Sequence, residues 1–128
     1  MGSAADDIAS GIMGKWAAAF SRLDADALAS LYSRHALFFG SNPNLYRGRD
    51  GVTDYFNGLP RWRTSSVRFS DVVAEQAGPN LVNVAGTASF EADEGAVNLS
   101  VKITWVIVRE DFDWKIVSHH ASSKAPLI

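Results

Sequence analysis

The sequence predicts an α+β fold in which three N-terminal helices pack on a curved, mainly antiparallel sheet. Two observations predict this class. Apolar residues recur at helical spacing in the first half of the chain, whereas from Thr64 onward there are only runs rich in Val, Thr, Ile and Phe, separated by turn residues. Helices that precede a long run of strands are typical of α+β domains, whose helices cover one face of the sheet. A length of 128 residues suits one domain, spanning 1–128.

Three helices are expected in the first half. The first is predicted from about residue 6 to residue 21, because apolar residues recur there every four positions: Ile8, Ile12, Trp16 and Phe20. Asp24 or Asp26 can cap a short second helix. The apolar positions of this second helix are Leu28, Leu31 and Tyr32. Asp50 is expected to cap the third helix, which ends at Gly58.

The strands are predicted from residue type and from the turns between them. A strand at 35–40 and a return beginning near Leu45 precede the third helix. Turn residues then divide the second half of the chain at Gly78, Gly95 and Asp111. The four strands separated by these turns are expected to be antiparallel neighbours, and they cover 65–76, 81–92, 97–109 and 113–123.

The third of these four strands has two unlike faces. Alternate side chains form an apolar row: Val97, Leu99, Val101, Ile103, Trp105 and Ile107. The residues between them are polar as far as Thr104. An antiparallel sheet with one face in the core has this pattern, and if it curls around the helices its concave face leaves a pocket suited to a small ligand.

Composition excludes several classes of function. The formal net charge is −2 and Lys and Arg are not clustered, so nucleic-acid binding is not expected. The chain has no cysteine, which removes disulfides and thiolate metal sites and suits a cytoplasmic protein. Apolar runs are too short to span a bilayer, and the N-terminus has no signal-peptide pattern, so no membrane association is expected.

The last predicted strand carries two adjacent histidines, His119 and His120. Strict alternation of side chains would place His120 on the face of Trp114 and Ile116, and His119 on the opposite face, at a subunit interface or in solvent. His120 is therefore the candidate catalytic residue, a pocket imidazole acting as general base or donor beside Ser122; a purely structural histidine is the alternative. Because the two rings diverge, they cannot share an ion, and no metal site is predicted.

Three segments, 16–28, 36–56 and 114–122, resemble the nuclear-transport-factor-2-like superfamily, which includes SnoaL-like cyclases and ketosteroid isomerases. The last segment is similar to the association domain of calcium/calmodulin-dependent protein kinase II and its free-standing bacterial relatives. That similarity rests on Trp114, Ile116, Val117, His120, Ser122 and Pro126. The resemblance implies a cone-shaped domain with a deep pocket, assembled as a homodimer or larger homo-oligomer, and it names no reaction.

The resemblance also bears on charge in the pocket. Relatives often place an arginine on the penultimate strand beside the pocket, and the matching position here is Lys102, which cannot make the bidentate carboxylate contact of arginine. Arg47 and Arg49 are interpreted as solvated loop charges.

Two functions follow as alternatives. The first is a small-molecule-binding domain whose only catalysis would be proton transfer without a cofactor, with His120 as base. The second is a non-catalytic oligomerisation module with His119 in the interface. The predicted ligand-binding side chains combine aromatic and polar groups: Trp16, Phe20, Phe39, Tyr46, Tyr55, Lys102, His120 and Ser122.

Overall fold

The computed structural model describes residues 3–128 and contains three helices and one six-stranded sheet. The first half holds α1 (Ala4–Ser21), α2 (Ala25–Ala29), β1 (Tyr32–Phe39), β2 (Leu45–Arg47) and α3 (Gly48–Asn57). The second half holds β3 (Ser65–Gly78), β4 (Leu81–Ala92), β5 (Val97–Glu110) and β6 (Asp113–Ser123). This arrangement confirms the α+β class expected from the sequence.

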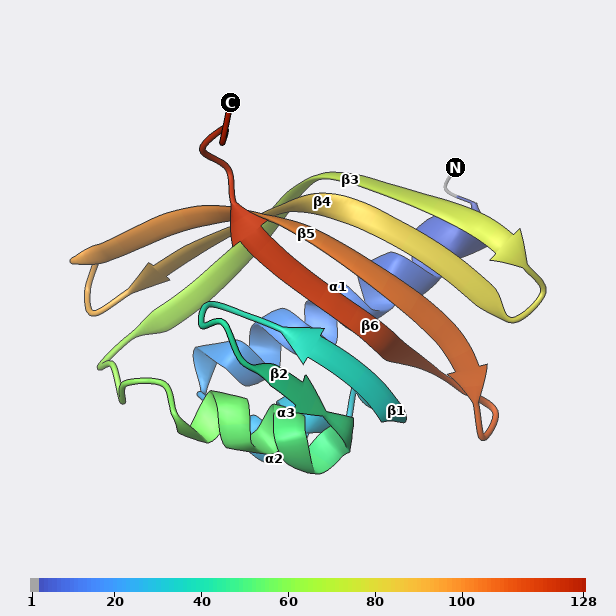
Figure 1. Ribbon diagram of the computed structural model, residues 1–128, viewed down its shortest axis with the longest axis horizontal. Coiled ribbons are helices and arrows are strands. Elements are labelled where there is room, and N and C mark those ends of the chain that lie inside the picture. Colours follow the sequence, from blue (N-terminus) through green and yellow to red (C-terminus); the bar gives the residue numbers. More distant parts are fainter. Residues whose placement is uncertain (1–2) are drawn as a thin grey trace.

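The sheet has the order β2-β1-β6-β5-β4-β3. Its strands pair antiparallel except for β1 and β6, which run parallel, so the expectation of a mainly antiparallel sheet is confirmed. Figure 1 shows the four long strands β3 to β6 curving over α1, while α2 and α3 lie together under the same concave side. The helices thus cover one face of the sheet, and the other face is free of them.

Side-chain caps begin two of the three helices, and the cap at Asp24 was predicted from the sequence. Ser3 and Asp6 form a capping box at the start of α1, and the Asp24 side chain accepts a hydrogen bond from the Ala27 amide at the start of α2. The prediction that Asp50 caps the third helix is wrong. α3 begins earlier, with Arg47 at the N-cap, and Asp50 lies in its first turn, where a negative charge still favours the helix dipole.

The core is built on aromatic side chains from both layers. The Trp16 ring in α1 stacks on Phe20 and meets Phe56 of α3 edge-on. It also meets Phe69 of β3 edge-on and lies within 6.4 Å of Trp105 in β5. Each of these pairs buries a large apolar area, so α1 is fixed against the sheet at this level.

A β-bulge interrupts β6. Val106 of β5 pairs with Ser118, but the next residue, Ile107, pairs with Ile116, so Val117 is an extra residue without a partner on β5. Alternation of side chains therefore restarts after Val117. Ile116 and His119 face the core together, although strict alternation would have put them on opposite faces.

Candidate functional site

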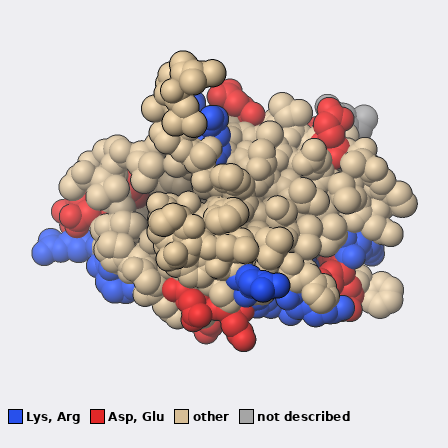
Figure 2. Space-filling model, in the orientation of Figure 1, with Lys and Arg blue, Asp and Glu red and all other residues tan. Residues whose placement is uncertain are grey.

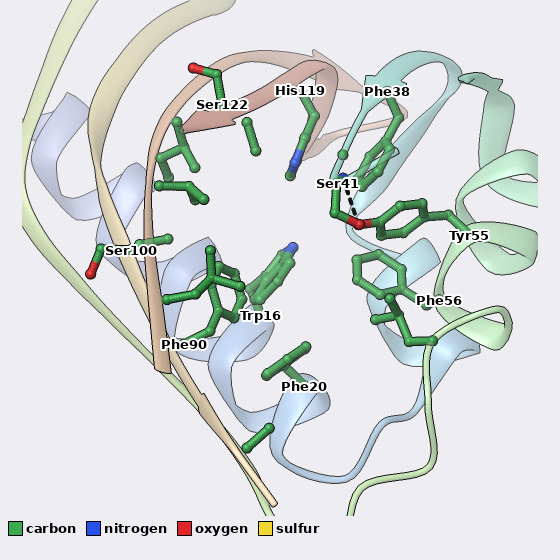
Figure 3. A pocket seen from close by; sticks show the side chains of 18 of the residues that line it. Trp16, Phe20, Phe38, Ser41, Tyr55, Phe56, Phe90, Ser100, His119 and Ser122 are labelled. Carbon is green, nitrogen blue, oxygen red and sulfur yellow. Dashed lines mark hydrogen bonds between the residues drawn. The ribbon is translucent and has the colours of Figure 1, made fainter. Parts of the chain in front are cut away.

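A cavity of about 470 Å³ lies between the concave face of the sheet and the helices α1 and α3. Its walls are mainly aromatic, and they include Trp16, Phe20, Phe38, Tyr55, Phe90 and Trp105. The apolar row predicted on β5 also lines it, from Val97 to Trp105. None of the lining residues is Asp, Glu, Lys or Arg, so the cavity has no fixed charge. Figure 3 shows the side chains converging on this space from both layers.

His119 is the histidine that lines the cavity, and it is held from behind by two hydrogen bonds to Nδ1. The indole Nε1 of Trp105 donates to this nitrogen at 3.0 Å, and the Tyr32 hydroxyl lies 2.8 Å from it. The Tyr32 oxygen in turn accepts a hydrogen bond of 3.0 Å from Trp16 Nε1. Trp105 and Tyr32 thus fix the Nδ1 edge of the imidazole, and Trp16 holds Tyr32 in place.

These contacts determine where the proton of the imidazole lies. An indole N–H can only donate, so Nδ1 of His119 must be the unprotonated acceptor, and the ring proton is on Nε2. The Tyr32 hydroxyl, whose oxygen already accepts from Trp16, can donate to the same Nδ1. The network therefore selects the Nε2–H tautomer.

The Nε2 atom of His119 faces the cavity. It makes no hydrogen bond within residues 3–128, yet no fully enclosed side-chain nitrogen or oxygen in this part of the chain lacks a partner. Nε2 must therefore be accessible, and His119 is one of the residues that line the cavity. Figure 3 shows the ring extending from β6 toward Trp16 and the Ser41–Tyr55 pair.

Burial keeps this imidazole neutral. Burial lowers the pKa of His119 from 6.5 to about 3, and the neighbouring charge of His120 adds to the decrease. The geometry acts in the same direction, since a proton on Nδ1 would face the indole N–H of Trp105, which can only donate. Burial likewise raises the pKa of the Tyr32 phenol far above its usual range, so that hydroxyl keeps its proton.

A second polar group lies across the cavity, at the junction of β1 and α3. The Tyr55 hydroxyl accepts a hydrogen bond of 2.9 Å from the Ser41 amide and lies 2.7 Å from the Ser41 hydroxyl. The two hydroxyls share one bond, so one hydroxyl proton stays available at the cavity wall. Gly40 makes this contact possible, because a Cβ at this position would lie 2.5 Å from the Tyr55 ring.

Comparison with protein families identifies the domain. A family model for the SnoaL-like domain matches residues 10–126, nearly the whole chain. The chain belongs to the SnoaL-like domain family. A comparison with curated protein sequences gave no significant match.

Solved structures share the fold of this SnoaL-like domain at low sequence identity. One from Xanthomonas campestris, provisionally assigned as a calcium/calmodulin-dependent protein kinase II association domain, is 18% identical with a TM-score of 0.85 and covers 100% of this chain and 91% of that one. A provisionally assigned scytalone dehydratase from Novosphingobium aromaticivorans is 14% identical, with a TM-score of 0.83 and coverages of 94% and 84%. A provisionally assigned dehydratase of the NTF2-like family from Streptomyces avermitilis is 20% identical, with a TM-score of 0.81 and coverages of 94% and 96%.

The structure of the SnoaL-like domain brings four of the predicted ligand-binding residues to the cavity: Trp16, Phe20, Tyr55 and Ser122. Ser122 lies at the rim, and its hydroxyl points away from the cavity in Figure 3. Tyr46 packs behind Tyr55, with ring centroids 5.3 Å apart, and its hydroxyl accepts from Asn42. Lys102 is exposed on the outer face of β5.

The facing predicted for the two histidines is reversed. His120 is exposed on the outer face, where its ring lies 5.7 Å from that of Phe39, which is also outside the cavity. His119, expected at an interface or in solvent, is 6% exposed and lines the cavity. The bulge at Val117 is the physical cause, because it shifts the alternation by one residue.

Several residues of the site were not predicted as such. Tyr32 was assigned to the second helix, yet it opens β1 and bonds to His119. Phe38, which stacks on His119, and Ser41 were not among the predicted ligand-binding residues. The one signal in the sequence for a buried acceptor near this site was Trp105 in the inward row of β5, since a buried indole N–H needs a hydrogen-bond acceptor.

The part of the chain that the structure describes, residues 3–128, contains no cluster of three or more His, Asp or Glu side chains that could hold a metal ion. Within the same range, no helix has the length and apolar character needed to cross a membrane.

Proposed function

We propose that this SnoaL-like domain binds a neutral, largely apolar small molecule in the cavity, and that Nε2–H of His119 donates a hydrogen bond to an oxygen of that molecule. The observation that carries the proposal is the hydrogen bond from Trp105 Nε1 to His119 Nδ1, which leaves the ring proton on the cavity side. A volume of about 470 Å³ falls in the range of small-molecule sites.

The uncharged lining favours a neutral ligand. A carboxylate or ammonium group inside the cavity would lose its hydration without gaining an ion-pair partner, because no lining residue is charged. Lys102, the only cation proposed for this pocket from the sequence, is on the other face of the sheet. An acceptor such as a carbonyl oxygen suits the available donors best.

The tautomer also decides what chemistry His119 supports. A donor aimed at a carbonyl oxygen polarises it and stabilises negative charge that develops there. A general base needs a free lone pair, and the lone pair of Nδ1 is already occupied by Trp105 and Tyr32. His119 is thus proposed as a hydrogen-bond donor. The general-base role that sequence analysis gave to His120 lacks a cavity location.

The test compares three ligands of one shape: acetylnaphthalene, ethylnaphthalene and naphthoate. Titration calorimetry on the wild type should rank the neutral ketone first. The hydrocarbon should bind about tenfold more weakly, the value of one buried hydrogen bond, and the carboxylate more weakly still. His119→Phe should remove the preference for the ketone over the hydrocarbon, whereas the matched control His120→Phe should keep it.

Two results would contradict the proposal: naphthoate binding as tightly as the ketone, or an unchanged ketone preference in His119→Phe. A hydroxylated ketone can then be followed for loss of water, because two of the similar structures are provisionally assigned as dehydratases.

A second function, association between copies of the chain, is favoured by an apolar patch outside the cavity. Leu37, Phe39 and Leu45 are 47%, 38% and 45% exposed, and Phe39 pairs with Leu45 across β1 and β2. Figure 2 shows that the charged side chains of this face gather at its margins. One similar structure is provisionally assigned as an association domain. His119 is inside the protomer, so this interface would involve His120, next to Phe39, in its place.

Light scattering tests association. The wild type should form a dimer or larger assembly, and Leu37→Lys should give a monomer. Val73→Lys is the control, because Val73 is an exposed apolar residue of the distant strand β3. A monomeric wild type would rule this function out.

A further inference from the structure

Tyr32, which bonds His119 from behind, stands at the start of an irregular segment of β1. Its side chain is completely buried, and its backbone pairs with Ile116 of β6. The next paired residue of β1 is Leu37, opposite Ser118, an advance of five residues on β1 for two on β6. The residues between Tyr32 and Leu37 therefore leave the ladder, and regular pairing does not fix Tyr32 on that side.

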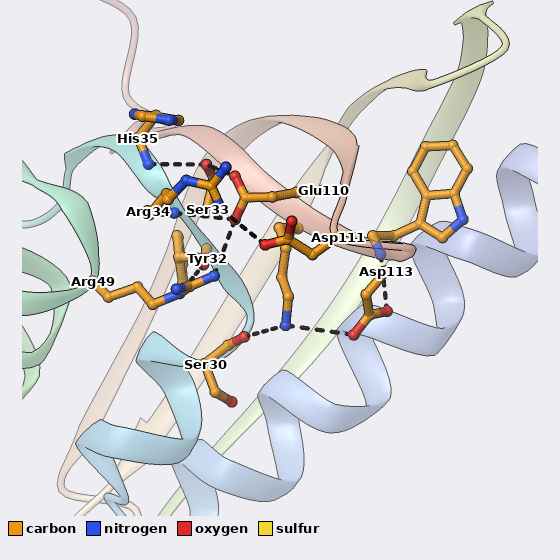
Figure 4. A network of polar contacts seen from close by, with 11 residues as sticks. Ser30, Tyr32, Ser33, Arg34, His35, Arg49, Glu110, Asp111 and Asp113 are labelled. Carbon is orange, nitrogen blue, oxygen red and sulfur yellow. Dashed lines mark hydrogen bonds and ion pairs between the residues drawn. The ribbon is translucent and has the colours of Figure 1, made fainter.

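An ion pair between half-exposed Arg49 and buried Glu110 lies where the ladder is missing. Arg49 of α3 donates from Nε to the Tyr32 carbonyl oxygen at 2.9 Å, and its Nη2 lies 3.0 Å from Glu110 Oε2. Glu110, at the end of β5, also accepts from the Ser33 hydroxyl at 2.6 Å and from the Arg34 amide at 3.3 Å. Figure 4 shows the guanidinium of Arg49 placed between the Tyr32 backbone and Glu110.

Arg49 was interpreted as a solvated loop charge, but it lies in α3 and, although its side chain is 41% exposed, it bonds to Tyr32 and Glu110. The side chain of Glu110 is only 9% exposed, and burial alone would raise the pKa of its carboxyl. The hydrogen bonds from Ser33 and Arg34, together with the charges of Arg34 and Arg49, outweigh burial and hold that pKa below its usual value. Two guanidinium nitrogens thus have different fixed partners, the Tyr32 carbonyl and the charged carboxylate of Glu110, and these two bonds set the orientation of the Arg49 side chain.

We propose that Arg49 is a positioning residue for His119. By holding the Tyr32 carbonyl, it fixes the backbone from which the Tyr32 hydroxyl reaches His119 Nδ1. Glu110 anchors Arg49 in this position. α3 thereby serves the cavity at both ends, since its first turn holds Tyr32 and its last turn supplies Tyr55. The inference rests on the proposed role of His119, but it can be tested without any ligand.

The test reads the tautomer of His119 by heteronuclear NMR of its ring nitrogens in the ligand-free protein. The wild type should show one tautomer, with the proton on Nε2, between about pH 5 and 8, where an ordinary histidine titrates. Arg49→Met should loosen the bond from Tyr32 to Nδ1, so the Nδ1 resonance of His119 should shift and His119 should titrate at a higher pH than in the wild type, while Trp105 still holds the ring proton on Nε2. Affinity for acetylnaphthalene should fall about fivefold, as expected when one hydrogen bond is misaligned.

Arg34→Met is the matched control. Arg34 belongs to the same cluster, but its side chain pairs with exposed Asp111 and does not touch Tyr32. This variant should leave the Nδ1 resonance and the titration of His119 unchanged. Arg49→Lys is the second variant, for the case that Arg49→Met does not fold. A lysine keeps the charge opposite Glu110 but cannot also donate from a second fixed nitrogen to the Tyr32 carbonyl, so the His119 signals should still shift.

An unchanged Nδ1 resonance and titration of His119 in folded Arg49→Met, or in Arg49→Lys if only that variant folds, would overturn the positioning role. The proposed function fails separately. If the Nδ1 resonance shifts as expected while acetylnaphthalene binds neither the wild type nor the variant, Arg49 positions His119 but His119 does not serve this ligand class.

Discussion

The phenyl ring of Phe38 stacks on the imidazole of His119, with ring centroids 4.0 Å apart and planes inclined by 21°. The same phenyl ring lies 4.7 Å from the ring of Tyr55. Phe38 thus supports both polar groups of the cavity. One of them, His119, belongs to the sheet, and the other, Tyr55, belongs to the helical layer. The contact links the sheet to α3 at the level of the proposed ligand.

Phe38→Ala should therefore be among the most damaging single changes in this domain. Phe38 is 1% exposed, and removal of a buried phenyl ring costs about 3–5 kcal/mol. The neighbouring Phe39, 38% exposed on the outer face, provides the control, and Phe39→Ala should cost about 1 kcal/mol or less. Urea unfolding measures both. Equal losses for the two variants would mean that Phe38 is not the support described.

Gly40→Ala should destabilise the domain by about 1–3 kcal/mol, because the new methyl group would overlap the Tyr55 ring. In a Tyr55→Ala background the same change should cost almost nothing, since the ring is gone. Gly14→Ala is the control, because a Cβ at this α1 position meets no atom within 4 Å. That variant should gain up to about 1 kcal/mol. A Gly40→Ala penalty that persists without Tyr55 would contradict the explanation.

The stability of the protein should fall as the pH decreases from about 6.5 toward about 3, the window between the ordinary and the lowered pKa of His119. In this window His119 is protonated in the unfolded chain but stays neutral in the native protein. Unfolding therefore becomes more favourable by about 1.4 kcal/mol for each unit by which the pH falls. Unfolding at about pH 7 and pH 5 keeps clear of the carboxyl groups, which titrate lower. His119→Gln should lose this slope, and His120→Gln should retain it.

Glu110→Gln should cost about 1.5–3 kcal/mol, because it removes the charge from a buried network of hydrogen bonds. Asp111→Asn is the adjacent control. Asp111 pairs with Arg34 at the surface, where an ion pair is worth about 0–1 kcal/mol, and asparagine tolerates its left-handed backbone. Thermal or urea unfolding distinguishes the two. If the surface change is the more harmful one, the Glu110 network is not a support of the fold.

Much of the fold could be predicted because the second half of the chain follows simple alternation between recognisable turns. β4 and β6 have the predicted bounds, and β5 extends one residue beyond its prediction. The inward row of β5 was visible as Val, Leu, Ile and Trp at every second position, and the same row lines the cavity. Turn chemistry and period-two patterning are local properties, so a single sequence contains them.

The site could be predicted only in part, because its decisive features are not local. The residue types around Val117 do not indicate an unpaired position. Yet this one unpaired residue exchanges the faces of the sheet on which His119 and His120 lie. Tyr32 fits a helical spacing with Leu28 and Leu31, but α2 ends at Ala29 and the chain is already extended at Tyr32. The partner that gives Arg49 its role, Glu110, lies at the far end of β5.

The placement of the tryptophans gives the cavity a reporter of its own. Of the four tryptophans in the chain, Trp16, Trp62 and Trp105 line the cavity, while Trp114 lies elsewhere, beside Arg109. A ligand that enters the cavity would change the surroundings of these three fluorescent side chains, and the fluorescence of Trp114 would serve as an internal reference. Intrinsic fluorescence of the unlabelled protein should therefore register occupancy directly, which makes a blind search through compound collections practical.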